Sequence, residues 1–199
     1  MSSPQVDSSG QAPPNLPAGS FSVWLSGMQA AIDGRGESDV PCGDCVACCT
    51  SSQFIHIGPD ETDPLSVIPE ELLFPAPMMP AGHVLMGYDE SGSCPMLIEG
   101  QCSIYEHRPQ TCRTYDCRVF PAAAVGLNDD DNLVSLRARR WRFEHPAPRD
   151  ELEHHAVRAA ARHISEHGDA RDENRIPTNS TQLAVLAIRR HGDFLNGPA

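Results

Sequence analysis

Apolar residues recur at helical spacing soon after the start of the chain. They lie at positions i, i+3 and i+4 in the segment FSVWLSGMQAAI, which is the pattern of one helix face. Ser20 can cap the start of this helix and Gly34 can end it. The residues of the apolar face are Phe21, Trp24, Leu25, Met28 and Ile32. So large a face predicts that the helix packs on another part of the chain.

Two further helices are predicted near the end of the chain. Residues 151–167 form a helical pattern that stops at Gly168, and residues 180–191 form another. Asn179 is followed three residues later by a glutamine, which is capping-box spacing. Both segments are therefore expected to be regular helices.

The middle of the chain predicts short elements joined by turns. Six prolines within residues 57–82 leave room only for pieces such as a helical turn at 69–73. Residues 83–105 indicate short strands around two turns, of sequence DESG and EGQ. The second turn would bring Cys94 and Cys102 to neighbouring positions.

Two stretches of the second half are less regular. Residues 106–117 predict a tight turn that leads into a short helix, whereas residues 133–143 fit either a helix or a strand. The start of the chain, residues 1–19, is rich in Ser, Pro and Gly and is expected to be disordered.

Composition indicates a loop-rich protein with a modest core. The chain has 199 residues, 40% of them hydrophobic, and 18 prolines, which is about twice the usual share of ~5%. Such a chain needs stabilisation beyond hydrophobic burial. A metal site can supply it, because the free energy of metal binding then becomes part of the free energy of folding.

The charge of the chain argues against a nucleic-acid partner. The net charge is −12 and the isoelectric point is near 5.0, whereas a nucleic-acid binder normally has a basic face. The start of the chain lacks the pattern of a secretory signal, and no segment has the apolar length of a membrane span. We therefore expect no membrane partner and a cytoplasmic protein, in which thiols stay reduced.

Eight cysteines lie within one part of the chain, and four of them fall in the segment CGDCVACC. Reduced, clustered thiols favour metal binding over disulfides. The opening C-x2-C-x2-C spacing is that of bacterial ferredoxins, whereas zinc ribbons use two separated C-x2-C pairs. This spacing favours an iron–sulfur cluster over zinc. The eight are Cys42, Cys45, Cys48, Cys49, Cys94, Cys102, Cys112 and Cys117.

The number of metal sites is left open by the sequence. Eight thiols satisfy two tetrathiolate sites, or one site with spare or redox-active thiols. Cys48 and Cys49 are adjacent, and in an extended segment their side chains would point to opposite faces. In that case they would serve different sites, or different metals of one assembly.

The cysteine segments resemble a known family. CGDCVACC, followed by CPMLIEGQCSIYEHRPQTCRTYDC, is similar to the YkgJ-type cysteine-cluster family (CxxCxxCC), a zinc- or iron-chelating domain, over about residues 41–120. The resemblance implies that all eight cysteines are metal ligands. A related cysteine cluster occurs in flagellin lysine methylases. Because this chain has no Gly-rich cofactor-binding loop, that activity does not carry over.

Arginines stand beside the cysteines in the family motif. Arg108, Arg113 and Arg118 would offset the negative charge of a tetrathiolate site or donate hydrogen bonds to sulfur, and so tune the bound cofactor. We assign this role above all to Arg108 and Arg113. The alternative is surface ion pairing with Glu106 and Asp116.

Other motifs carry less weight. His163 and His167 are four residues apart but lack an HExxH context, so they are expected on a solvated helix face. His56 and His83 lie in the cysteine region and are possible ligands. The segment RARRWR places four arginines around Trp141, where they contact either an anionic partner or, as we favour, the acidic remainder of the chain.

These observations predict an α+β fold, in which a small irregular cysteine-rich domain with short strands is stapled by metal and packed with N- and C-terminal helices. The predicted parts are a disordered tail (1–19), a helix with the cysteine-cluster domain (20–120) and a C-terminal helical region (121–199). The predicted function is binding of iron–sulfur cluster(s) with a redox or cluster-dependent role. The alternative is a zinc-binding protein that acts as a metal carrier or as a structural or interaction module. An enzymatic activity is neither predicted nor excluded, and the partner is an unspecified protein or small molecule.

Overall fold

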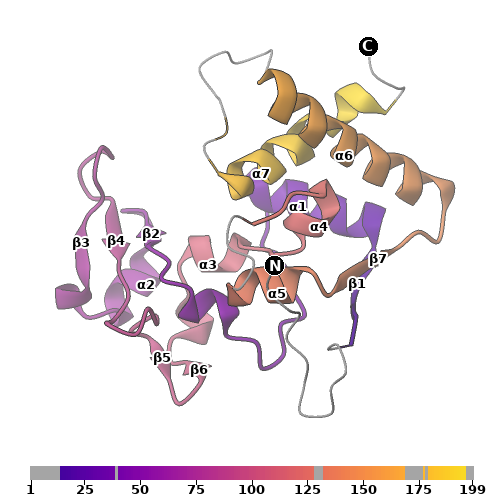
Figure 1. Ribbon diagram of the computed structural model, residues 1–199. Coiled ribbons are helices and arrows are strands. Elements are labelled where there is room, and N and C mark those ends of the chain that lie inside the picture. The colour runs from indigo at the N-terminus through magenta and orange to yellow at the C-terminus, as the bar shows by residue number, and fades with distance from the viewer. Residues whose placement is uncertain (1–13, 39, 128–131, 169–176, 178, 196–199) are drawn as a thin grey trace. The chain divides into compact units, whose positions relative to one another are not determined.

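The computed structural model describes residues 14–38, 40–127, 132–168, 177 and 179–195 (Figure 1). The chain divides into two compact units. We call Met1–Gln29, Cys117–Asp131 and Ser135–Ala199 the helical unit, and Ala30–Asp116 with Asn132–Val134 the cysteine unit. Helices combined with short strands in small sheets confirm the predicted α+β class.

The helical unit combines helices with one pair of strands. Strands β1 and β7 pair in parallel, with Leu16 opposite Trp141 and Ser20 opposite Glu144. Residues 16–19, which were predicted to be disordered, belong to β1, and residues 1–13 of the predicted tail lie outside the described residues. The elements with residues in this unit are β1 (Leu16–Ser20), α1 (Phe21–Ile32), α4 (Val119–Ala123), α5 (Leu133–Ala138), β7 (Trp141–Glu144), α6 (Pro148–His167), α7 (Ser180–Arg190) and η4 (His191–Phe194).

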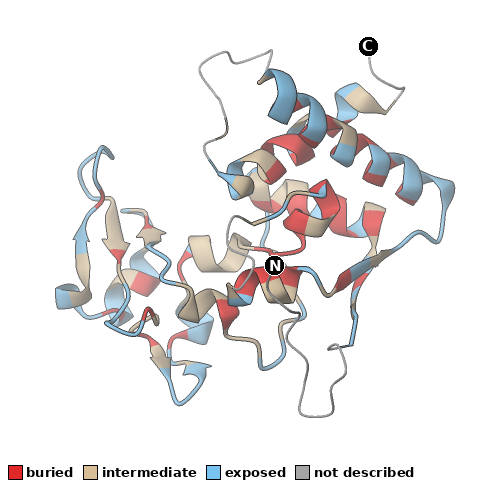
Figure 2. Ribbon diagram, viewed as in Figure 1, coloured by how far each residue is buried: buried red, intermediate tan, exposed pale blue. Residues whose placement is uncertain are grey.

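Aromatic rings and small residues form the core of the helical unit. Phe21, at the start of α1, is fully buried and packs edge-to-face on Phe143 of β7, with ring centroids 5.0 Å apart. Helices α6 and α7 bury their inward faces, which are red in Figure 2. Alanines such as Ala160 and Ala187 are fully buried there, and their small side chains allow the two helices to approach closely. The predicted helices are thus confirmed.

Side-chain caps fix the ends of these helices. The Asn179 side chain accepts a hydrogen bond from the backbone N–H of Gln182 at 2.9 Å, as the capping-box spacing predicts. Helix α6 begins earlier than predicted, at Pro148, because Asp150 accepts a hydrogen bond from the Ala147 N–H at 3.0 Å. Proline at the first helical position adds to this start, since it has no N–H to leave unpaired.

The cysteine unit contains a small antiparallel sheet and a hairpin. The sheet has strand order β2-β4-β3, and β5 pairs with β6 across a turn in which Glu99 and Gly100 both have positive φ. Such a turn matches the twist of a hairpin. The elements are η1 (Ala47–Thr50), β2 (Ile55–Ile57), α2 (Thr62–Val67), η2 (Glu70–Leu72), β3 (Leu73–Pro75), β4 (Val84–Met86), β5 (Leu97–Ile98), β6 (Gln101–Cys102), η3 (Tyr105–His107) and α3 (Gln110–Thr114).

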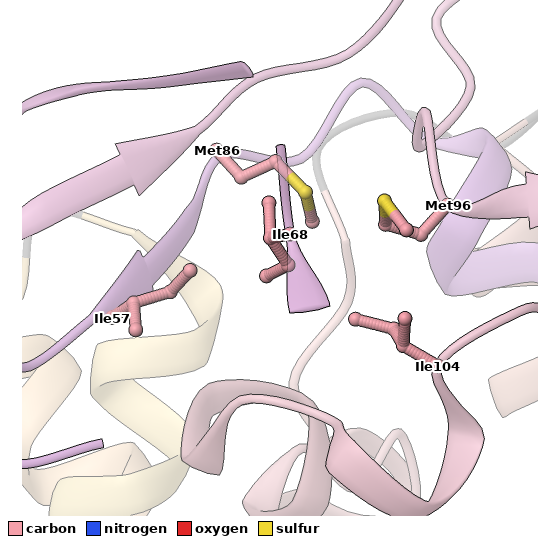
Figure 3. Packing of buried hydrophobic residues seen from close by; sticks show 5 residues of the cluster. All are labelled: Ile57, Ile68, Met86, Met96 and Ile104. Atoms are coloured by element: carbon pink, nitrogen blue, oxygen red, sulfur yellow. The ribbon is translucent and has the colours of Figure 1, made fainter. Parts of the chain in front are cut away.

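The core of the cysteine unit is small. Its buried centre consists of Ile57, Ile68, Met86, Met96 and Ile104 (Figure 3). Cys94 and Cys102 pack against this centre and are themselves partly exposed. Two of the thiols therefore lie at the rim of the core.

Residues 133–143, which fit either a helix or a strand, contain one of each, namely α5 and β7. In the described part of the chain, no helix combines the length and the apolar character that crossing a membrane requires.

Candidate metal centre

The cysteines are all free thiols, and they are divided between the two units. Seven lie in the cysteine unit and are half-buried. Cys117 lies in the helical unit and is buried. The candidate centre is therefore built chiefly from short elements of the cysteine unit.

A tight turn presents the first two thiols. The N–H of Cys45 donates to the carbonyl of Cys42 at 3.1 Å, which closes a turn over the four residues. Gly43, inside the turn, has φ of 55°, a conformation that glycine adopts without steric cost. This glycine allows both cysteines to stand at the ends of one turn.

Cys48 and Cys49 belong to the 3-10 helix η1 and not to an extended segment. The N–H of Cys49 donates to the carbonyl of Val46 at 2.9 Å. Because such a helix has about three residues per turn, the two adjacent side chains leave it about 120° apart. They still point in different directions, although not to opposite faces.

Two backbone hydrogen bonds join the segment around Cys49 to the loop before Cys94. The N–H of Cys94 donates to the carbonyl of Cys49 at 2.6 Å, and Ser52 donates to Gly92 at 2.9 Å. The Asp89 carboxylate accepts hydrogen bonds from backbone N–H groups of the same loop. These contacts bring the first and second cysteine segments together.

The β5–β6 hairpin brings Cys102 towards Cys94. Leu97 lies opposite Cys102, and its N–H donates to the carbonyl of Cys94 at 2.9 Å. The two thiols are close enough that Cys102 raises the pKa of Cys94. The predicted neighbourhood of Cys94 and Cys102 is thus confirmed.

Helix α3 carries Cys112, as the predicted turn and short helix require. The Cys112 N–H donates to the carbonyl of Pro109 at 2.9 Å in the first turn. The Thr111 hydroxyl donates to the carbonyl of His56 at 2.8 Å and holds α3 against β2. The sheet therefore positions the fourth cysteine segment.

Six thiols of the cysteine unit share one electrostatic neighbourhood. Burial and, after it, the nearby thiols raise the pKa of Cys49 to about 11 and that of Cys112 to about 12. Burial also raises the pKa of Cys94. The thiols that interact in this way are Cys42, Cys45, Cys49, Cys94, Cys102 and Cys112. Without a cation, Cys49, Cys94 and Cys112 stay protonated at neutral pH.

Two features oppose the rise in thiol pKa. The charge of Arg108 lowers the pKa of Cys112, while its guanidinium lies 3.7 Å from the ring centre of Tyr105. The backbone N–H groups of Met96 and Leu97 lower the pKa of Cys94. Both features favour thiolate over thiol.

A comparison with family models now bears on this site. Residues 41–135 match the CxxCxxCC family. The family is described as a putative zinc- or iron-chelating domain. The match confirms the resemblance in the cysteine motifs and indicates a zinc- or iron-chelating function for this segment. Neither the curated proteins nor the solved structures gave a match to the chain.

Cys117, the last cysteine of the CxxCxxCC segment, has a different environment. The indole N–H of Trp141 donates to its sulfur at 3.1 Å. The guanidinium of Arg137 lies 5.0 Å from the centre of the Trp141 ring, and that of Arg118 lies 5.9 Å from it. The sequence analysis did not identify Trp141 as a partner of Cys117. The only local hint was a tryptophan among the arginines of RARRWR.

The other predicted site residues have defined partners. Arg113 forms an ion pair with Glu37 at 2.9 Å. The acidic partner is thus neither Glu106 nor Asp116, which were the predicted alternatives. The rings of His56 and His83 are hydrogen-bonded to each other, with Nε2 and Nδ1 2.9 Å apart. The roles of Arg108 and Arg113 near a bound cofactor, and of the eight cysteines as ligands, stay predictions.

The chemistry of the donor set fits a thiolate-bound metal. Thiolate is the ligand that both zinc and iron–sulfur clusters prefer, and a cation would offset the mutual repulsion of deprotonated thiols. Over the described residues, however, no three His, Cys, Asp or Glu side chains are already grouped to hold a metal ion.

Proposed function

We propose that the CxxCxxCC segment binds an iron–sulfur cluster through its cysteines and has a redox or cluster-dependent role. The observation that carries this proposal is the neighbourhood of six thiols in the cysteine unit. When bound, such a cluster supplies reversible electron transfer or an open coordination position.

The turns of the cysteine unit support a cluster over an isolated zinc ion. The turn from Cys42 to Cys45 and the following η1 helix present the C-x2-C-x2-C cysteines in succession, which is the ligand order of ferredoxin-like sites. Backbone N–H groups near the sulfur of Cys94 add hydrogen-bond donors, and such donors tune cluster potential. Thiols held by turns in this manner suit a polynuclear centre.

The charge balance points in the same direction. Arg108 acts on Cys112, and the backbone N–H groups of Met96 and Leu97 act on Cys94, so part of the negative charge of a thiolate site is already offset. These groups stabilise the thiolate form that binds metal. Their role is to hold and orient the ligands and to set the potential.

The test is metal and sulfide analysis of protein purified without oxygen. We expect iron and acid-labile sulfide together, with a broad absorbance near ~400 nm that is typical of cysteine-ligated clusters. Cys49→Ser should lower iron, sulfide and absorbance together, because Cys49 interacts with four of the other thiols.

A control variant separates loss of a ligand from general damage. Ser66→Ala changes an exposed hydroxyl on α2 that donates only to the carbonyl of Asp63, and it should retain full cofactor content. Colourless protein with stoichiometric zinc would contradict the cluster and support the zinc alternative, either a carrier or a structural module. Full retention of iron and sulfide by Cys49→Ser would remove Cys49 from the ligands.

A further inference from the structure

A cavity of about 480 Å³ lies in the helical unit, between strand β7 and helix α6. Its apolar wall includes Trp141 and Phe143 of β7. Its volume falls in the range of ~300–1,000 Å³ that is usual for small-molecule sites. Apart from Pro121, the residues that line the cavity lie beyond the segment 41–135, so the zinc- or iron-chelating domain does not account for it.

Two arginines face this cavity from different elements. Arg142 of β7 donates to the carbonyls of Arg139 at 2.7 Å and Trp141 at 2.9 Å. Arg158 of α6 donates to the carbonyl of Pro121 at 3.5 Å. Among the described residues, neither guanidinium has a carboxylate at ion-pair distance. In a chain of net charge −12, two such guanidiniums at one cavity are an unusual local excess of positive charge.

The imidazole of His154 in the cavity is also affected by this positive charge. His154 is 5% exposed, and its Nδ1 lies 2.8 Å from Nε2 of His145. Burial, followed by the charge of Arg158, holds the pKa of His154 down to about 4. Within the described part of the chain, no hydrogen bond of good geometry reaches its buried Nε2, although the Pro121 carbonyl lies near enough to favour the charged form slightly. An anion beside these groups would offset a repulsion that is otherwise uncompensated.

One carboxylate, that of Glu151, also lines the cavity. It is exposed on the first turn of α6, and Arg142 of β7 and Arg158 of α6 are exposed as well. The guanidinium charges therefore exceed the carboxylate charge at the cavity. Guanidinium groups bind the oxygens of carboxylates and phosphates in a bidentate manner.

We propose that this cavity binds a small organic anion, whose carboxylate or phosphate oxygens pair with Arg142 and Arg158 while its apolar part lies against Trp141 and Phe143. The proposal does not depend on the six thiols of the cysteine unit, because every residue it uses lies in the helical unit. It also gives RARRWR an anionic partner from outside the chain.

The experiment uses the full chain with two probes, inorganic phosphate and benzoate. Each is titrated at low salt by calorimetry, with tryptophan fluorescence as a second signal because Trp141 lines the cavity. We expect saturable binding at millimolar concentration or tighter, weakened by added salt. Binding of benzoate alone would identify a carboxylate on an apolar body, and binding of phosphate alone would identify a phosphate ligand. Absence of saturable binding by both probes would overturn the proposal.

Variants on the two walls test the assignment. Arg158→Gln and Arg142→Gln should each weaken binding about tenfold, since each removes a charged hydrogen-bond donor. Arg149→Gln is the matched control: Arg149 is also on α6 but pairs with Glu153 at 2.8 Å outside the cavity. Circular dichroism confirms folding, and the second arginine variant keeps the test valid if one variant unfolds. Equal weakening by Arg149→Gln, or no weakening by either cavity variant, would show that the site is elsewhere.

Discussion

At the scale of single residues, burial keeps thiols of the cysteine unit protonated in the absence of a cation. The pKa of Cys112 is raised to about 12, mainly by burial, from an ordinary value of 9.0. A thiol in this position keeps its proton until a metal replaces it. Metal uptake by the folded chain should therefore release protons, and metal affinity should fall at low pH.

The raised pKa of Cys112 also predicts how the metal-free protein responds to alkali. Between pH 9 and pH 12 the unfolded chain releases a proton that the folded chain still holds. The stabilising contribution is thus complete below pH 9 and lost as pH rises through the folded pKa. Urea unfolding of reduced, metal-free protein should show stability falling over this range, and Cys112→Ser should make the fall shallower. An unchanged slope in the variant would show that Cys112 titrates normally.

How far the sequence predicts the site also depends on individual residues. The eight cysteines and the closeness of Cys94 to Cys102 follow from spacing and one turn. The contact of Trp141 with the sulfur of Cys117 does not, because the two residues lie 24 positions apart and no periodicity links them. The pairing of Arg113 with Glu37, across 76 positions, is missed for the same reason.

At the scale of elements, helices are predicted better than strands. Helices α1 and α7 show their apolar period in local sequence, and α7 also shows its cap, Asn179. The predicted cap of α1 was wrong, because the Ser20 hydroxyl donates to Asp150 and the Asp150 carboxylate accepts from the Ser22 N–H. Strand β1, of sequence LPAGS, contains proline and glycine and has no alternation of apolar and polar residues. It is a strand because β7 pairs with it, more than a hundred residues later, and strand formation depends on such partners more than on propensity.

One carboxylate connects these elements and gives a prediction. Asp150 accepts hydrogen bonds from the Ser20 hydroxyl at 2.6 Å, the Ser22 N–H at 2.9 Å and the Ala147 N–H at 3.0 Å. It thereby caps both α1 and α6. Asp150→Ala should lower the melting temperature by about 5 °C, because backbone N–H groups at the starts of both helices would then have no acceptor.

Differential scanning calorimetry of Asp150→Ala is compared with Glu151→Ala. Glu151 is an exposed acidic residue in the same first turn, so its loss removes the same charge from the helix dipole without removing the three hydrogen bonds. A similar decrease in both variants would show that charge, and not hydrogen bonding, is what Asp150 contributes.

At the scale of the whole molecule, the two units differ in what stabilises them. The helical unit buries the aromatic and alanine-rich faces of its helices. The cysteine unit has a centre of five buried residues, with two thiols at its rim. Small cores of this kind usually need a disulfide or a metal, and all the cysteines are free thiols. Metal binding should therefore contribute to the folding of one unit more than to that of the other.

Hydrogen exchange after chelation tests this division. When the metal is removed under reducing conditions, the amides of β2 and β4 in the cysteine unit should lose most of their protection, because their core depends on a bound cation. The amides of α6 and α7 should keep theirs, since the apolar packing of the helical unit does not involve the six-thiol neighbourhood. Restoring the metal should restore protection to the strands. Equal loss in both units would mean that they unfold as one cooperative body, and unchanged protection in the strands would mean that the metal has no structural role.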